Sequence, residues 1–185
     1  MKQAIDNHIK NQDFVKAYLV DEEDSSITHI EGIIFEQTDK LILMNDMTDF
    51  YYDGLTVIRK KDLSEIKHTD NERFFKTILD KEDITQKIRT HREKIKVNLS
   101  KYKDLLVQVI ETKQPVIIEC KYANDDRFLV GPITKIEDKY IKIKHFNSLG
   151  QYDLKEIKVK IKDITILKID SPYANIFYKY ANELK

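Results

Sequence analysis

Residues 32–44 read Gly-Ile-Ile-Phe-Glu-Gln-Thr-Asp-Lys-Leu-Ile-Leu-Met, and residues 131–143 read Gly-Pro-Ile-Thr-Lys-Ile-Glu-Asp-Lys-Tyr-Ile-Lys-Ile. The Gly, Asp and Lys positions coincide without a gap, and most of the apolar positions follow them. After a two-residue insertion, residues 62–66 (Asp-Leu-Ser-Glu-Ile) align with residues 163–167 (Asp-Ile-Thr-Ile-Leu). A repeat of this length predicts two similar folded units within one chain.

The chain has 185 residues, enough for one medium core or two small ones, and the repeat favours two. Short apolar runs separated by polar turns predict five strands per unit, and residues 156–162 alternate between Ile or Val and Lys or Glu as a half-buried strand does. We expect a mainly β (α+β) fold with two five-stranded barrels, each preceded by a helix. The expected domains are residues 1–78, a helical connector at 79–97, and residues 98–185. Residues 73–97 contain no Gly or Pro, and Asp83 is expected to begin a second helical segment there.

Three stretches of the first unit resemble a known family. They are Gly32 in the second strand, Asp39 through Met44-Asn45 in the third, and Val57-Ile58-Arg59-Lys60-Lys61-Asp62 across the corner between the fourth and fifth. Together they are similar to the Sm-like small β-barrel, the fold of eukaryotic Sm proteins and of bacterial Sm-like RNA chaperones. The match departs from the family pattern in two places, because four residues separate Asp39 from Met44 and Lys60 stands at the corner glycine. The resemblance implies two tandem Sm-like barrels in a bacterial protein.

The resemblance also implies RNA contacts at Asn45 and Arg59, which match the asparagine and arginine that reach RNA bases in Sm-like rings. An amide can hydrogen-bond a base edge, and a guanidinium can stack on a base. The alternative interpretation is a loop asparagine and an exposed arginine at a strand end. It is the stronger one, because this half of the chain is acidic and repels phosphate.

Charge is distributed unevenly along a chain whose formal net charge is zero. Residues 1–80 contain 10 Lys/Arg and 17 Asp/Glu, whereas residues 101–185 contain 16 and 12. The two halves could attract each other, order a head-to-tail assembly, or simply keep the protein soluble. In the second half, Lys142, Lys144, Lys158 and Lys160 are the candidate nucleic-acid-binding residues, beside stacking faces offered by Tyr140 and Tyr152. The stronger interpretation is a solvated strand whose lysines prevent edge pairing.

Three consecutive aromatic residues, Phe50, Tyr51 and Tyr52, lie at a predicted hairpin tip. They cannot all face one core, so at least one is expected to contact a partner, a subunit or another part of the chain. Docking on the connecting helix is the equally weighted alternative.

Signals for catalysis are weak. The five histidines are scattered, the only cysteine is Cys120, and no glycine-rich phosphate loop or Gly-x-Ser-x-Gly elbow is present. We therefore expect no catalytic residues, no metal, no cofactor and no membrane contact, in a cytoplasmic protein that is a monomer or small homo-oligomer. The expected function is a non-catalytic interaction module that binds a protein partner or itself through strand edges. RNA or single-stranded nucleic-acid binding by the second unit is the alternative, and a small-molecule sensor is a third.

Overall fold

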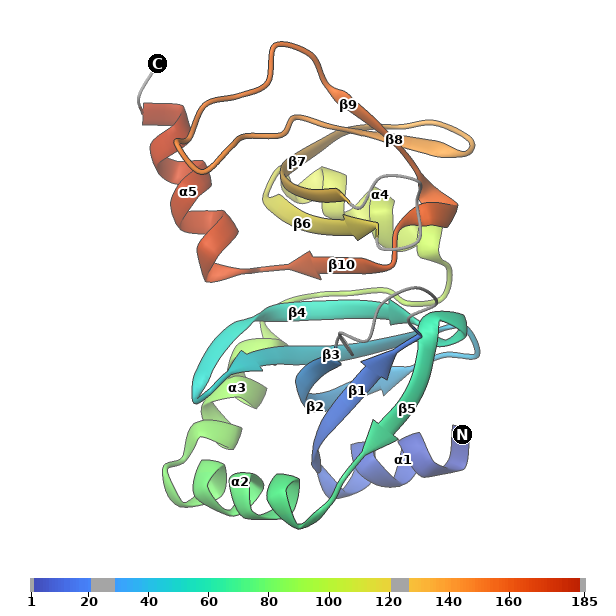
Figure 1. The fold of residues 1–185 in the computed structure, drawn as a ribbon, viewed down its shortest axis with the longest axis vertical. Helices are drawn as coiled ribbons and strands as arrows, with labels where there is room; N and C mark the ends of the chain where they lie inside the picture. The colour runs from blue at the N-terminus through green and yellow to red at the C-terminus, as the bar shows by residue number, and fades with distance from the viewer. Residues whose placement is uncertain (1, 21–28, 121–126, 184–185) are drawn as a thin grey trace. The chain divides into compact units, whose positions relative to one another are not determined.

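A computed structural model describes residues 2–20, 29–120 and 127–183 of the chain (Figure 1). The chain divides into two compact units. The first comprises Met1–Asp53 and Val57–Leu99, and the second comprises Gly54–Thr56 and Ser100–Lys185. No helix within the described ranges is long and apolar enough to cross a membrane.

Both units repeat one order of elements. The first contains α1 (Lys2–Asn11), β1 (Phe14–Leu19), β2 (His29–Gln37), β3 (Leu41–Thr48), β4 (Tyr51–Arg59), the 3-10 turn η1 (Lys60–Asp62), β5 (Leu63–Lys67), α2 (Asp70–Lys81) and α3 (Ile84–Glu93). The second contains α4 (Tyr102–Thr112), β6 (Pro115–Cys120), β7 (Arg127–Ile136), β8 (Tyr140–Ile143), β9 (Ile157–Lys160), η2 (Ile161–Asp163), β10 (Ile166–Ile169) and α5 (Pro172–Glu183). Among the described elements of the first unit, α3 alone has no counterpart in the described part of the second.

The strands do not close into barrels. Their hydrogen-bonded order is β5-β1-β2-β3-β4-β10-β6-β7-β8-β9, so the described strands form one open ten-stranded sheet with β5 and β9 at its edges. The expectation of two tandem Sm-like five-stranded barrels is therefore wrong. A closed first barrel would need β4 to pair with β5, but β4 has β10 as its outer neighbour, and its segment Gly54–Thr56 belongs to the second unit. Periodicity locates strands, but it does not say which edges meet.

The sequence repeat is confirmed by the hydrogen bonds. In β2 a bulge lies between Ile34, opposite Met44, and Glu36, opposite Leu43. In β7 the same bulge lies between Ile133, opposite Ile143, and Lys135, opposite Lys142. The corners agree as well, because Lys60 N–H donates to the Lys40 carbonyl and Ile161 N–H donates to the Lys139 carbonyl. Positions up to β3 and β8 thus correspond at a separation of 99 residues, and positions from β4 and β9 onward at a separation of 101.

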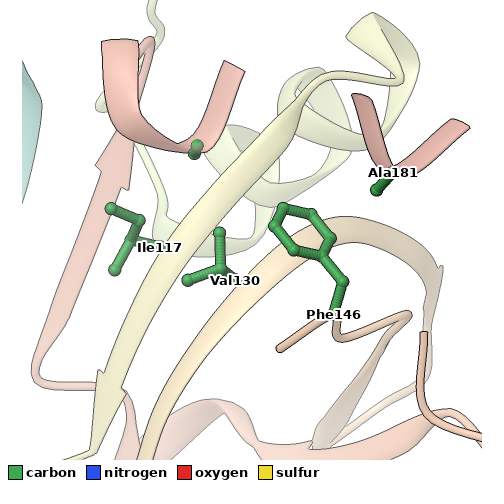
Figure 2. Close-up of a cluster of buried hydrophobic side chains, with 5 residues drawn as sticks. Ile117, Val130, Phe146 and Ala181 are labelled. Atoms are coloured by element: carbon green, nitrogen blue, oxygen red, sulfur yellow. The ribbon is translucent and has the colours of Figure 1, made fainter. Parts of the chain in front are cut away.

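Each unit has its own apolar cluster beneath a helix. In the first unit, Leu79 of α2 and Ile88 of α3 pack with Phe14 and Met47 of the sheet. In the second, Ile117 of β6, Val130 of β7 and Phe146 meet Ala181 of α5, as Figure 2 shows. Burial of these side chains holds α2, α3 and α5 on their sheets.

The predicted break in the connecting helix is confirmed. The helix α2 ends at Lys81 and α3 begins at Ile84, with Asp83 in the left-handed conformation (φ 58°) between them. Aspartate tolerates this conformation better than most residues, so it suits a corner between two helices.

Candidate functional site

The most distinctive surface of the chain is the solvent face of β7, β8 and β9. Cross-strand register places Lys135 of β7 opposite Lys142 of β8, and Lys142 opposite Lys158 of β9. On the same face, Tyr140 of β8 lies opposite Lys160 of β9. Directly opposite residues project to the same side of a sheet. These five residues form one surface, called here the lysine face: Lys135, Tyr140, Lys142, Lys158 and Lys160.

Apolar burial on the other side of the strands fixes this orientation. Ile141 and Ile143 of β8 and Val159 of β9 are buried, so the alternate positions turn toward solvent. The side chains of Lys135 and Lys158 are 61% and 51% exposed. Burial of the alternate residues therefore keeps the lysines on the solvent side of the strands, where they remain exposed.

Sequence reasoning missed Lys135. Counting alternately from the buried Ile133 puts Lys135 on the inner side, and only the bulge between these two residues turns it outward. A bulge adds one residue to a strand and so reverses the alternation beyond it. The repeat offers a signal for this bulge. The corresponding strand β2, which contains Gly32, has a bulge at the corresponding position.

One carboxylate lies within the lysine face. Glu137 pairs with the Lys158 ammonium at 3.1 Å and with Lys135 at 3.5 Å. The hydrogen bond from Lys158 and the charges of Lys158 and Lys135 hold the pKa of Glu137 below its usual value, against an opposing effect of burial. Among the described residues, no carboxylate pairs with Lys142 or Lys160. The lysine face is thus strongly positive.

The tyrosine of the lysine face already interacts with a cation. The Lys158 ammonium lies 4.1 Å from the centroid of the Tyr140 ring, within the range of a cation–π interaction. This ring is the one aromatic group of the lysine face. An anion and a flat ring can therefore both be bound on this surface.

Lys144, also predicted to bind nucleic acid, is held differently. Its ammonium donates to the Asp153 carbonyl at 2.7 Å and lies 5.9 Å from the Tyr152 ring. Tyr152 in turn packs edge-on against the buried Phe146. Lys144 therefore fastens the segment between β8 and β9 to the sheet.

Asn45 and Arg59 lie in the first unit and are both engaged internally. Asn45 is fully buried, and its side-chain oxygen accepts a hydrogen bond from the Ile33 N–H at 2.7 Å. The guanidinium of Arg59 donates through Nε to Asp62 at 2.6 Å, with both side chains largely buried. These contacts stabilise the sheet and its corner.

The aromatic hairpin tip packs largely on the helices that follow. Phe50 stacks on Phe75 of α2 with ring centroids 4.7 Å apart, and Tyr52 meets His91 edge-on at 5.0 Å. Tyr51 lies between them and is 78% exposed. Tyr51 is therefore the member of this trio with the most exposed side chain, because Phe50 is 41% exposed and stacked on Phe75.

Two of the histidines that look scattered in the sequence meet at one carboxylate. His8 of α1 bonds Asp13 at 2.8 Å, and His68 lies 3.8 Å from the other oxygen of Asp13. His68 also bonds the Phe14 carbonyl through Nδ1 at 2.9 Å, so that nitrogen bears the proton. The cluster joins α1 to the segment between β5 and α2. Across the described ranges, no group of three His, Cys, Asp or Glu side chains is arranged to hold a metal ion.

No family model, curated protein or solved structure matches this chain.

Proposed function

We propose that this chain is a non-catalytic interaction module that assembles head to tail with further copies through the outer edges of its sheet. The observation that supports it is the strand order, in which β5 and β9 each have one strand neighbour among the described residues. A strand edge presents unpaired backbone N–H and C=O groups, which bind another strand readily.

The internal repeat supports the same pairing. In the repeat, β9 corresponds to β4 and β5 corresponds to β10, and β4 and β10 are neighbours in the strand order. The β4–β10 pair is thus already formed within the chain. The corresponding strands, β9 and β5, lie at the two ends of the strand order. Repeating one contact from copy to copy is a heterologous, head-to-tail mode of assembly.

The charges of the edge strands favour pairing of β9 with β5 of another copy over pairing of β9 with β9. The β9 edge has Lys158 and Lys160, so two β9 edges would oppose lysine to lysine. The β5 edge includes Glu65, which pairs with Lys67 of the same strand at 3.3 Å, and it lies in the acidic half of the chain. The corresponding internal strands, β4 and β10, contain the buried apolar residues Leu55 and Leu167, whereas the outer strands carry charged side chains. Association through the outer strands should therefore be reversible and sensitive to salt.

Sedimentation velocity over a range of protein concentrations tests this proposal. We expect association that grows with concentration at about 50 mM salt and weakens at about 500 mM, where charges are screened within about 4 Å. Glu65→Lys should weaken association because it places a cation opposite the lysines of β9. Glu82→Lys makes the same charge change at the exposed end of α2 and should leave association unchanged. A monomer at every concentration and salt would contradict the proposal.

A further inference from the structure

The two units differ in the burial of corresponding residues on one face of the repeated strands. The positions of the first unit that correspond to Lys135, Lys142 and Lys158 are Glu36, Leu43 and Val57. Leu43 and Val57 are buried, with 0% and 1% exposure.

In the first unit, the helix α3 packs beside the Glu36 position. Arg92, next to the end of α3, lies 3.6 Å from Glu36, and its guanidinium is 6.0 Å from the Phe35 ring. Ile88 of the same helix packs in the cluster that contains Met47 of β3. The side chains at these positions are therefore a packing surface in the first unit.

The second unit leaves the corresponding surface exposed. Its helix α5 packs instead over Ile117 of β6 and Val130 of β7 (Figure 2), and no element described in the second unit corresponds to α3 (Figure 1). Lysines replace the apolar residues at two of the three positions. These positions are thus largely buried and apolar in the first unit, and charged and exposed in the second.

The arrangement of these lysines is unfavourable for the sheet alone. Like charges directly opposite each other on neighbouring strands are destabilising, and Lys142 has a lysine on both sides. Glu137 offsets the charge of only two of the four lysines. An anionic ligand would relieve this repulsion.

We propose that the lysine face binds single-stranded nucleic acid, with phosphates at the lysines and a base against the Tyr140 ring. Successive phosphates need a row of cations, and Lys135, Lys142 and Lys158 form such a row across three strands. A phosphate that engages Lys158 would draw its ammonium from the Tyr140 ring and free that ring for stacking. Acidic polypeptides and anionic lipids offer the charge but no flat ring to stack. The lysine face shares Lys158 and Lys160 with the β9 edge of the proposed assembly, whereas Glu65→Lys on β5 changes only the assembly.

Fluorescence anisotropy with labelled oligo-dT and oligo-U tests the proposal on the full chain. The triple variant Lys135→Gln, Lys142→Gln and Lys158→Gln should bind about tenfold or more weakly at about 50 mM salt. Its log–log salt dependence should be shallower by about 2, because each lost phosphate contact removes about 0.7. The matched control is Lys81→Gln, Lys87→Gln and Lys103→Gln, which removes three exposed lysines elsewhere and should bind as the wild type does.

Tyr140 distinguishes nucleic acid from other polyanions. Tyr140→Ala should weaken oligonucleotide binding about tenfold, whereas Tyr140→Phe keeps the ring and should restore most of it. Competition by polyglutamate or by phosphatidylserine vesicles as strong as by oligonucleotide, with Tyr140→Ala neutral, would overturn the proposal. No oligonucleotide binding by the wild type at low salt would overturn it too. Circular dichroism melts check folding, and the single variants Lys142→Gln and Lys160→Gln replace the triple variant if it unfolds.

Discussion

The backbone of Gly32 lies directly against the carbonyl of Asn45. A Cβ atom built on Gly32 would be 2.0 Å from the Asn45 carbonyl oxygen. In the second unit, a Cβ on Gly131 would be 2.1 Å from the carbonyl oxygen of Lys144. The same close approach of two strands thus occurs in both copies of the repeat, and it requires a residue without a side chain.

Gly32→Ala and Gly131→Ala should each be strongly destabilising. The added methyl group would meet a backbone oxygen, so the two strands must move apart and lose register. We expect a loss of about 3 kcal/mol or more in the free energy of unfolding, or no folded protein. Urea denaturation measures it, with Thr134→Ala, exposed on β7, as the control. Near-wild-type stability of both glycine variants would show that this contact is not as close as described.

Asn45→Ala should cost more stability than Lys144→Ala, although the two positions correspond. In the first unit, the Asn45 side chain satisfies the Ile33 N–H. In the second unit Pro132 stands at that position and has no N–H, so no acceptor is needed there. A buried donor without a partner costs about 1–3 kcal/mol. Equal losses in chemical denaturation would contradict this explanation of the difference.

The charge on Glu72 should make stability depend on pH. Burial acts to raise the pKa of Glu72, but hydrogen bonds from the Thr69 hydroxyl and backbone N–H outweigh it and hold the pKa below its usual value. A lowered pKa stabilises the fold above about pH 4.3 and loses that effect as the pH falls through the folded-state pKa.

The measurement compares wild type with Glu72→Ala. At neutral pH the variant should be less stable by about 1 kcal/mol, the usual contribution of a helix cap. As the pH falls below about 4.3 the difference should shrink, and it should vanish below the folded-state pKa, because protonated Glu72 no longer accepts both bonds as a carboxylate. A difference that stays constant down to pH about 3 would count against it. Glu82→Ala, exposed after α2, controls for loss of a surface charge.

Alanine substitutions of Phe50 and Tyr51, at the tip of the β3–β4 hairpin, should differ in their effect on stability. Phe50→Ala removes a ring stacked on Phe75 and should destabilise the first unit by about 1 kcal/mol beyond its lost burial. Tyr51→Ala changes a residue that is mostly in solvent and should leave the melting temperature unchanged. Thermal melts of the two variants measure this. Equal melting temperatures would mean that the Phe50 ring does not stabilise the helix α2.

The local features of the fold followed from the sequence, because they depend on residues close together in the chain. The repeat, the corner after Arg59 and the break at Asp83 are of this kind. The site was harder to predict. Lys135 needs the bulge in β7 to turn outward, and the meeting of His8, Asp13 and His68 needs the sheet to bring distant segments together.

Apolar periodicity and composition can be read along the chain, so they were enough to predict that one strand-rich unit occurs twice and that the two halves of the chain differ in charge. The open sheet, the burial of Asn45 and the alignment of three lysines across β7, β8 and β9 became visible only in the folded chain. Those outcomes depend on which strand edges pair and in which register, and hydrogen bonds between distant segments set both.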